Sequence, residues 1–336
     1  MNTIGNCREL YDTFNQTNYM KIWFDLVGKM EKEGFIWGSL LENDEWNQYM
    51  SPSLYTLPEK QWNAIQTATK EITFLFQKVW KLVASNKDLF QKLGLPKELW
   101  NAVLIEPMNT WFSYFCRYDF IINGDTIKIV EANADTPTGL MEPSVANRII
   151  CDAHGVYHPN TIEEHLTRAW KQIIIDYGIQ PTDKIFYTSY ANHDEDRETV
   201  HFNLKHCPHP LKEYIGVEDI YVADDGLYSP NGEKIEYLYR LYPLEYLIDD
   251  VDDKGNPIGK LFLHHIATGK VKVINPPSAM IIQSKTILAI IWELFESKSI
   301  LLTKQDRETI EKYFLPTYFT PEPFEKHQIP YVCKPV

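Results

Sequence analysis

The sequence predicts an α/β protein of the mixed α+β kind, in which a helical part precedes strands that alternate with helices. Three observations support this fold class. Residues 8–110 carry apolar side chains at helical spacing, residues 111–150 hold two apolar strands around an Asn123-Gly124 turn, and residues 160–240 alternate between strand-like and helical segments. Together they predict a single domain over residues 1–336.

The composition is that of a soluble globular protein with an ample core, since 44% of the 336 residues are hydrophobic and 24% are charged. No apolar run of about 18 residues occurs, so we expect no membrane span. The first residues lack the basic and apolar leader of an export signal. The five cysteines are odd in number and scattered, which favours reduced thiols and a cytoplasmic location.

The net charge of −13 disfavours broad nucleic-acid binding, which needs a basic face, and is compatible with a cationic small molecule. Glycine is scarce, at 15 residues, and the sequence contains neither a Gly-x-Gly-x-x-Gly fingerprint nor a Walker-type phosphate loop. We therefore expect neither a Rossmann site nor a P-loop site. The sequence leaves the oligomeric state open and does not exclude a homo-oligomer.

The helical part divides into two long helices and a short one. The first has an apolar face that includes Leu10 and Phe14, and it ends before a break with prolines and serines at residues 51–58. The second covers residues 62–82, and Leu95-Pro96 begins the third. Such apolar positions are typical of a core rather than of a binding site.

The second half of the chain alternates between helices and strands, which predicts a βαβ layer. We expect helices at residues 140–151, 161–177 and 194–206, strands at 184–188, 219–223 and 235–241, and an exposed acidic loop at 249–259.

Two lysines near the C-terminal end of the sequence are candidate phosphate-binding cations. Ser284 can cap a helix whose first residue is Lys285. A positive charge there opposes the helix dipole, which indicates an anionic neighbour, unless Lys285 is an ordinary solvated lysine. Residues 331–335 predict the end of a strand that carries Lys334.

Four polar side chains interrupt the two apolar strands in the middle of the chain. Arg117 and Asp119 lie on the first strand, and Glu131 and Asn133 lie on the second. Because residues two apart in a strand point the same way, each pair shares one face. Burying a charge without a partner is costly, so we expect these groups to meet each other, a metal or a ligand.

The turn decides whether the two pairs share the same face. A two-residue Asn123-Gly124 turn would leave Glu131 on the face opposite to Asp119. A three-residue loop over residues 123–125, or a β-bulge with the same effect, would bring all four groups together, and we expect this second arrangement. It would set oxygens of the kind that Mg²⁺ prefers beside an arginine suited to a phosphoryl group. The alternative is a salt-bridged hairpin that binds no ligand.

Two segments of this region resemble a known family. Arg-Tyr-Asp-Phe at 117–120 and Val-Glu-Ala-Asn-Ala-Asp-Thr-Pro-Thr-Gly at 130–139 are similar to the synthetase domain of glutathionylspermidine synthetase and its single-domain relatives, which are ATP-grasp ligases. The likeness covers most of residues 62–336. It implies an ATP-grasp synthetase fold with a pre-ATP-grasp-like βαβ layer. The implied parts are a mostly helical lead at 1–110, a metal and substrate hairpin at 111–150, an α/β subdomain at 155–275 and the start of the nucleotide lobe at 276–336.

The resemblance implies an enzyme, namely an ATP- and Mg²⁺-dependent carbon–nitrogen ligase. It would form an amide between a peptide carboxylate like that of glutathione and an amine like spermidine, through an acyl phosphate. The implied roles are Mg²⁺ binding by Asp119, Glu131 and Asn133, catalysis by Arg117, and ATP binding by Lys285 and Lys334.

The same resemblance places small-molecule substrates near a second set of residues. The short polar side chains of Asp135, Thr136 and Thr138 would bind the peptide carboxylate. Arg240 and Glu245 would lie near the substrates, although an ordinary surface ion pair is the other interpretation of these two.

The chain departs from the family in two ways. We expect no cysteine-amidase domain ahead of the synthetase, and therefore no hydrolysis of a glutathionyl-polyamine. The sequence ends at Lys334-Pro335-Val336, where the family continues into a glycine-rich loop over the phosphates, so we expect the C-terminal part of the nucleotide cleft to be missing. A noncatalytic relative that binds peptide or nucleotide without turnover is therefore the alternative function.

Two groups of cysteine and histidine offer a further alternative, a structural zinc site. They are Cys151, His154 and His158, and His206, Cys207 and His209. Neither group forms a familiar zinc-finger spacing, and each lacks a partner pair. Hydrolase motifs of the Gly-x-Ser-x-Gly or His-Glu-x-x-His type do not occur.

Overall fold

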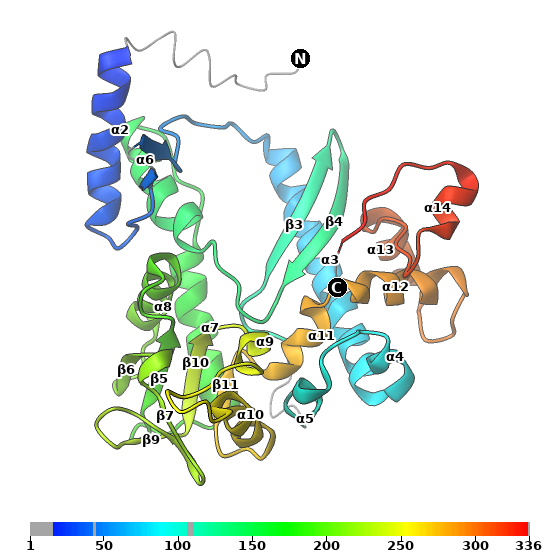
Figure 1. Ribbon diagram of the computed structural model, residues 1–336. Coiled ribbons are helices and arrows are strands. Elements are labelled where there is room, and N and C mark those ends of the chain that lie inside the picture. The colour runs from blue at the N-terminus through cyan, green and yellow to red at the C-terminus, as the bar shows by residue number, and fades with distance from the viewer. Residues whose placement is uncertain (1–15, 43–44, 106–110, 335–336) are drawn as a thin grey trace. The chain divides into compact units, whose positions relative to one another are not determined.

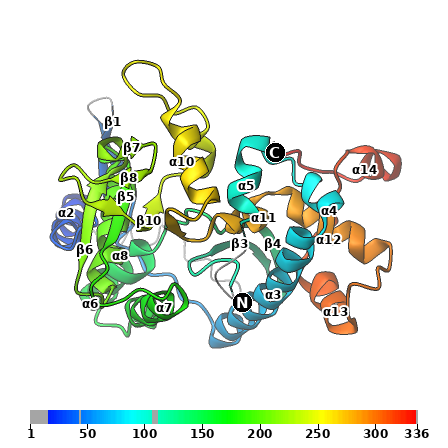
Figure 2. The same ribbon diagram turned by 90° about the horizontal axis from the view of Figure 1, so that it is seen from below.

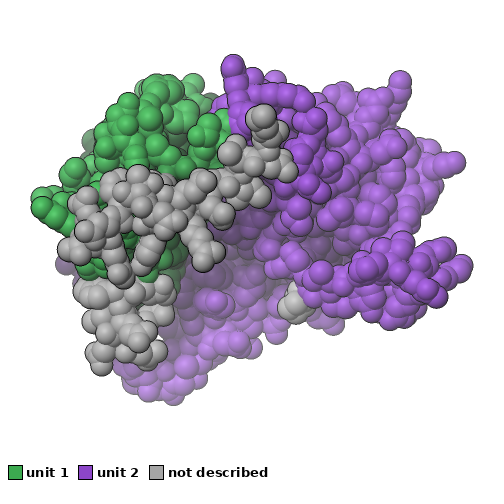
Figure 3. Space-filling view, turned by 90° about the horizontal axis from the view of Figure 1, so that it is seen from above, with its two compact units in different colours: residues 1–57, 138–219 green, residues 58–137, 220–336 purple. Residues whose placement is uncertain are grey.

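The computed structural model describes residues 16–42, 45–105 and 111–334, so Cys7 and the predicted helix positions Leu10 and Phe14 lie outside it (Figure 1). The described chain is a mixture of helices and short strands, as the sequence predicts. It forms two compact units, coloured separately in Figure 3. Unit 1 takes residues 1–57 and 138–219, and unit 2 takes residues 58–137 and 220–336.

In unit 1, α2 (Gln16–Glu31) packs against α6 (Asn147–Ala153), and β1 (Ser39–Glu42) pairs antiparallel with β2 (Glu45–Gln48). The predicted helix at 140–151 is present, but its first turn, η2 (Glu142–Ala146), is π-helical.

Glu142, at the start of η2, ties this turn to the earlier part of unit 1. Its Oε1 atom accepts hydrogen bonds from Trp37 Nε1 and Tyr49 Oη, both at 3.1 Å. Burial, together with the negative charge of Glu142, raises the pKa of Tyr49 to about 12.

Unit 1 also contains the predicted βαβ element. The strands β5 (Ile185–Ser189) and β6 (Lys212–Gly216) are parallel, and α8 (Asp194–His206) connects them and packs against both. A second helix, α7 (Ile162–Asp176), packs against α8. The sequence pattern does not predict β6, because lysine and glutamate at its start mask the apolar residues.

Unit 2 is built on the long helix α3 (Glu59–Ser85), which Figures 1 and 2 show in blue. Its buried residues recur every three or four positions. Trp80 on this face is 1% exposed, and its Nε1 atom donates a hydrogen bond to Ser278 O at 3.1 Å. Full burial of a Val, Leu, Ile or Phe side chain contributes about 1.5–3 kcal/mol, so packing of this face stabilises the helix. The buried residues are Ala68, Ile72, Leu75, Phe76, Val79, Trp80 and Val83.

The hairpin of β3 (Arg117–Asn123) and β4 (Thr126–Asn133) lies beside α3 in both ribbon views. The Tyr118 hydroxyl is hydrogen-bonded to Thr73 Oγ1 on α3 at 2.9 Å. Three apolar side chains of β4 are buried, namely Ile127, Ile129 and Ala132. The register of the hairpin shifts between Ile129 and Glu131, so Ala132 is buried like Ile127 and Ile129 although it lies an odd number of positions from both.

The remaining strands of unit 2 form two groups. β10 (Tyr237–Leu241) and β11 (Lys272–Ile274) are parallel. β7 (Tyr221–Ala223), β8 (Gly226–Tyr228) and β9 (Lys234–Ile235) form an antiparallel group, so the predicted strand at 235–241 is divided between β9 and β10.

The helix α10 (Ile258–Ala267) packs against β7 and β8 and against the short α9 (Leu244–Leu247). A Cβ atom at Gly259 would lie 1.7 Å from Leu247 O, so only glycine permits this packing. Gly259 is buried within α10, which begins at Ile258, so the predicted loop at 249–259 is shorter than expected.

The last part of unit 2 holds four helices and corrects two predictions. The helix after residue 285 begins without a side-chain cap and with Lys285 at the N-cap position, so Ser284 is not the cap. Residues 331–334 form no strand. The helices are α11 (Met280–Gln283), α12 (Thr286–Glu296), α13 (Lys304–Tyr313) and α14 (Glu322–His327). The first half of the unit adds α4 (Lys87–Gln91) and α5 (Trp100–Val103).

Among the described helices, none by itself has the length and apolar character that a membrane crossing requires. One pair, Pro277–Gln283 and Thr286–Glu296, meets the criterion only when the two helices are taken together, and they are bent by 63° at the break between them.

Candidate functional site

The turn of the β3–β4 hairpin differs from both predicted turns. Asn123 pairs with Thr126, so the two turn residues are Gly124 and Asp125. Gly124 has a φ of +59°, a left-handed conformation that glycine adopts without strain. The Asn123-Gly124 turn and the three-residue loop over 123–125 are therefore both wrong.

A β-bulge brings the four polar residues of the hairpin together. The register shifts between Asp119 and Phe120, so that Asp119 pairs with Glu131 and Arg117 pairs with Asn133. Paired residues of an antiparallel ladder project from the same side. The bulge alternative is therefore confirmed, and the four side chains share one face.

Arg117 and Asp119 form an ion pair on this face. Arg117 Nε donates to Asp119 Oδ1 at 2.9 Å, and Nη2 donates to Oδ2 at 3.3 Å. Asn133 Nδ2 lies 3.5 Å from Asp119 Oδ2, at the outer limit of a hydrogen bond. The Arg117 and Asp119 side chains are 43% and 38% exposed, so both are within reach of a ligand from solvent.

Glu131 contacts both candidate lysines. Its Oε1 atom lies 3.2 Å from Lys285 Nζ, and its Oε2 atom lies 3.5 Å from Lys334 Nζ. Lys334 Nζ is also 3.4 Å from Val130 O. The four polar residues of the hairpin and the two candidate lysines thus form one cluster in unit 2, which we call the Glu131 cluster: Arg117, Asp119, Glu131, Asn133, Lys285 and Lys334.

Gln283 positions Lys285 relative to the end of β4. Gln283 Oε1 accepts hydrogen bonds from Ala134 N at 2.7 Å and from Asp135 N at 3.1 Å. These amides directly follow the strand that carries Glu131 and Asn133. One side-chain oxygen therefore fixes the segment before Lys285 to the strand that carries the carboxylate.

Asn275 plays a similar part from the end of β11. Its Oδ1 atom accepts from Tyr114 N and Phe115 N at 3.1 and 3.2 Å. Its Nδ2 atom lies within 3.1–3.3 Å of Phe115 O, Ala134 O and Asp135 O. Asn275 is 1% exposed, so it links the segment before β3 to the segment after β4 inside the core.

Asp135 and Arg240 form a buried ion pair rather than a surface one. Each side chain is 1% exposed, and Arg240 binds both carboxylate oxygens through Nη1 and Nη2. Arg240 Nη1 also donates to Tyr242 O at 2.7 Å, while Arg240 Nε is buried without a hydrogen-bond partner in the described structure. The alternative interpretation, an ordinary surface ion pair of Arg240 and Glu245, is therefore wrong as regards Arg240.

Glu245 lies near this buried pair. Burial raises the pKa of its carboxyl group, the negative charge of Asp135 raises it further, and Arg240 opposes the shift. Of the other predicted substrate residues, Thr136 is half-buried in unit 2, and Thr138 is half-buried in unit 1.

The oxygens of the Glu131 cluster suit Mg²⁺ with a phosphate-bearing ligand. Mg²⁺ is usually held by one or two carboxylates together with phosphates and waters, and Asp119 and Glu131 supply two carboxylates on paired positions. No group of three or more His, Cys, Asp or Glu in the described chain could hold a metal alone. A Mg²⁺ ion bound by Asp119 and Glu131 would take its remaining oxygens from a ligand and from water.

The absence of such a group also overturns the zinc alternative for the described residues. His154, His158 and His209 each direct Nε2 at a backbone carbonyl of unit 1, at 2.7, 3.0 and 2.6 Å. Cys151 and Cys207 are buried free thiols.

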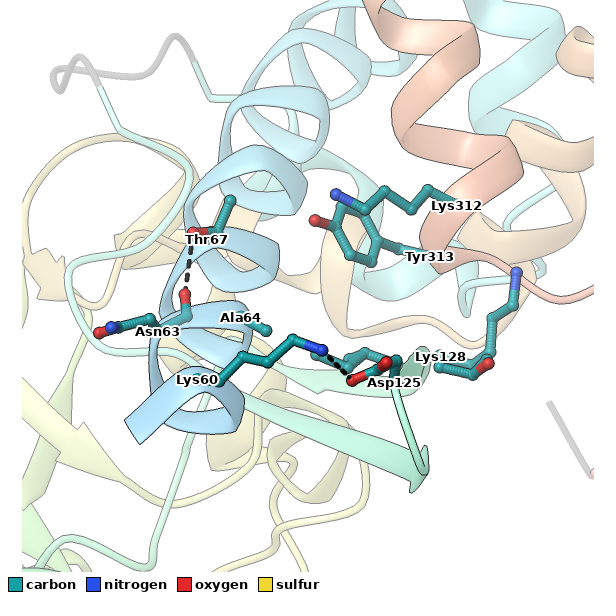
Figure 4. A pocket seen from close by; sticks show the side chains of 10 residues that line it. Lys60, Asn63, Ala64, Thr67, Asp125, Lys128, Lys312 and Tyr313 are labelled. Carbon is teal, nitrogen blue, oxygen red and sulfur yellow. Dashed lines mark hydrogen bonds and ion pairs between the residues drawn. The ribbon is translucent and has the colours of Figure 1, made fainter. Parts of the chain in front are cut away.

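A separate pocket of about 590 Å³ lies at the turn end of the hairpin, between α3 and α13 (Figure 4). Its lysines already have partners. Lys60 Nζ is 2.9 Å from Asp125 Oδ1, Lys128 Nζ donates to two carbonyls at the end of α13, and Lys312 Nζ lies 4.7 Å from the Tyr313 ring centre. Burial lowers the pKa of Lys128. The lining contains no residue of the Glu131 cluster.

A sequence profile described as glutathionylspermidine synthase preATP-grasp matches residues 20–336. The chain belongs to this family. A Haemophilus influenzae protein, whose acid–amine ligase activity is itself inferred, is 28% identical over 235 residues, which are 66% of this chain and 52% of that protein. The chain thus spans about half the length of this curated relative.

Among solved structures, a glutathione synthetase-like effector from Globodera pallida, in its apo form, is similar with a TM-score of 0.52. The match covers 90% of this chain and 71% of that chain at 13% identity. This likeness shows that the family member described here has a glutathione synthetase-like fold.

The sequence did not predict two residues whose hydrogen bonds hold the segments next to the hairpin, Gln283 and Asn275. Gln283 precedes Lys285 by two residues, and Asn275 directly follows the buried strand β11. A polar residue at the end of a buried strand is a signal that could have indicated Asn275. Nothing in the sequence alone pairs Gln283 with Ala134.

Proposed function

We propose that this chain is an ATP-grasp ligase that joins a carboxylate to an amine. The Glu131 cluster is the observation that carries the proposal, because two carboxylates, an amide, a guanidinium and two ammonium groups meet on one hairpin face. Phosphoryl transfer to a carboxylate needs positive charge around the transferring group and a divalent cation beside it. The family and the inferred ligase activity of the Haemophilus influenzae protein support the same reaction class.

Each member of the cluster has a proposed role that follows from its chemistry. Asp119, Glu131 and Asn133 would hold Mg²⁺, which supplies charge neutralisation on the phosphates of ATP. Lys285 and Lys334 bind phosphate oxygens as point charges. Arg117, a planar donor already aligned by Asp119, contacts the transferring phosphoryl oxygens and stabilises the charge that develops on them.

For the substrates, we propose a peptide carboxylate of the glutathione type and an amine of the spermidine type. Thr136 and Thr138 are half-buried, short and polar, which suits hydrogen bonding to a peptide carboxylate. The net charge of −13 favours a cationic amine electrostatically. We assign Asp135 and Arg240 a supporting role, because their side chains are 1% exposed and bind each other.

A noncatalytic relative is the second candidate function. The observation that favours it is that two predicted substrate residues, Asp135 and Arg240, are 1% exposed and bind each other, so they are not available to a substrate. Such a relative would bind nucleotide or peptide through the Glu131 cluster without forming an amide.

Calorimetric titration with MgATP, repeated with a non-hydrolysable analogue, tests the proposal first. We expect Mg²⁺-dependent binding of both nucleotides. Phosphate release should then be screened with peptide and amine pairs, and release that requires both partners would establish the ligase. Nucleotide binding without such release for any pair would favour the noncatalytic candidate. No nucleotide binding would contradict the ligase and the nucleotide-binding form of the noncatalytic candidate.

A further inference from the structure

Glu131 is already fully engaged by cations that belong to the protein. One carboxylate oxygen contacts Lys285 and the other contacts Lys334, at 3.2 and 3.5 Å. The neighbouring Asp119 is engaged in the same way, by two nitrogens of Arg117. The groups that would bind a divalent cation are therefore neutralised before any cation arrives.

We propose that Lys285 and Lys334 compete with the divalent cation for Glu131, so that metal binding becomes conditional on a phosphate-bearing ligand. This inference rests on the proposed function and adds an order of binding, in which the phosphate-bearing ligand binds before the metal. The phosphate groups of this ligand draw the two ammonium groups away from Glu131, and the carboxylate then accepts the metal. Without this ligand, the lysines keep the affinity of the Glu131 cluster for the divalent cation low.

Electrostatics supports the competition. Two ammonium groups within 3.5 Å of a carboxylate repel a divalent cation that approaches the same oxygens. Phosphate oxygens offer these lysines an alternative partner with more negative charge than one carboxylate. Each lysine can therefore pair either with the Glu131 carboxylate or with a phosphate group, and the presence of the ligand determines which pair forms.

Exposure allows the exchange to occur. The Lys285, Lys334 and Glu131 side chains are 39%, 42% and 25% exposed, and ion pairs of this kind are weak and easily broken. Asp135 and Arg240 form the contrasting case, since each is 1% exposed and could not exchange partners without leaving a buried charge. The Glu131 pairs can therefore act as a switch, whereas the buried pair is fixed.

The competition predicts opposite effects of one substitution on two ligands. Lys285→Gln and Lys334→Gln each remove one competing charge, so each should tighten Mn²⁺ binding in the absence of nucleotide, by about two- to fivefold. The same variants should weaken the binding of ATP in the presence of EDTA, because each loses a phosphate-binding cation. The double variant should show both effects more strongly.

The experiment measures free Mn²⁺ by electron paramagnetic resonance in titrations of the full chain, with metal-free ATP binding measured by calorimetry. Lys60→Gln is the matched control, because Lys60 pairs with Asp125 on the same hairpin, outside the Glu131 cluster, and the charge change is identical. It should leave both affinities unchanged. Glu131→Gln should remove the Mn²⁺ gain from the double lysine variant.

Mn²⁺ binding that is unchanged or weaker in the double variant than in the wild type overturns the competition. Tighter Mn²⁺ binding in Lys60→Gln would also overturn it, since net charge would then explain the gain. Failure of the proposed function looks different: the wild type would bind no nucleotide under any metal condition, whereas failure of this inference leaves wild-type nucleotide binding intact.

Discussion

Asp119 lies directly opposite Glu131 across the β3–β4 ladder, because the bulge in the hairpin shifts the pairing by one residue. Without this shift the two carboxylates would project from opposite sides of the hairpin. The pairing places one carboxylate beside Arg117 and the other beside Lys285 and Lys334. A single irregularity in one strand therefore assembles the candidate site.

The carboxylate pair predicts a shared metal. Asp119→Ala and Glu131→Ala should each abolish the Mg²⁺-dependent part of ATP binding, because Mg²⁺ loses one of its two charged protein ligands. Both side chains are partly exposed, so the thermal unfolding temperature should change little. Calorimetry checks the binding, and Asp125→Ala at the turn is the control. Unchanged Mg²⁺-dependent binding in both site variants would eliminate the site.

Arg117 is predicted to act on the transition state. Lysine keeps the charge but cannot donate from two nitrogens in a planar fork, so Arg117→Lys should lower kcat by about 10²-fold or more. ATP affinity should fall much less, since the ground state relies on Lys285 and Lys334. Steady-state kinetics with the identified substrates would separate the two effects. A loss confined to KM would contradict this role.

The buried pair of Asp135 and Arg240 is predicted to be structural. Arg240→Met leaves the Asp135 carboxylate buried without its partner, which should lower the free energy of unfolding by about 3–5 kcal/mol. Arg117→Met breaks an exposed pair in the same unit and should cost about 0–1 kcal/mol. Urea denaturation measures both. Equal, small losses of stability in the two variants would contradict the prediction, because the buried pair would then contribute no more than the exposed one.

Glu245 is predicted to make stability fall as pH rises. Its folded-state pKa is raised above its ordinary value of 4.5, so the folded state binds the proton more tightly than the unfolded state. Its contribution is therefore present below that ordinary value and is lost as pH rises through the raised pKa. Glu245→Gln should remove this loss, so that the variant gains stability over the wild type with increasing pH. Denaturation from pH 4 to pH 8 checks the difference, and a difference independent of pH would contradict the shift.

Gln283 is predicted to position Lys285. Gln283→Leu leaves the amides of Ala134 and Asp135 without their acceptor, which should cost about 1–3 kcal/mol of stability and weaken ATP binding through displacement of Lys285. Gln283→Glu keeps an oxygen acceptor and should preserve both properties more closely. Denaturation and calorimetry on the two variants provide the test. Equal ATP affinity in Gln283→Leu and the wild type would limit Gln283 to a structural role.

Much of the fold could be predicted from local pattern. The helix at 194–206 and the strand at 184–188 were predicted to within one residue, because apolar spacing and an acidic first turn mark them clearly. The strand β6 and the π-helical turn at Glu142–Ala146 were missed, since neither has a local signature that differs from a loop or an ordinary helix.

The sequence by itself determined which hairpin residues share a face, since the period-two spacing of a strand puts Arg117 with Asp119 and Glu131 with Asn133 in any fold that keeps the two strands. The tertiary structure decided how they meet. The bulge accompanies the burial of Ile127, Ile129 and Ala132, and the segment before Lys285 is held by a hydrogen bond between Gln283 and a backbone amide 149 residues away. It also decided that Arg240 is buried with Asp135, because burial arises from long-range packing that no local pattern encodes.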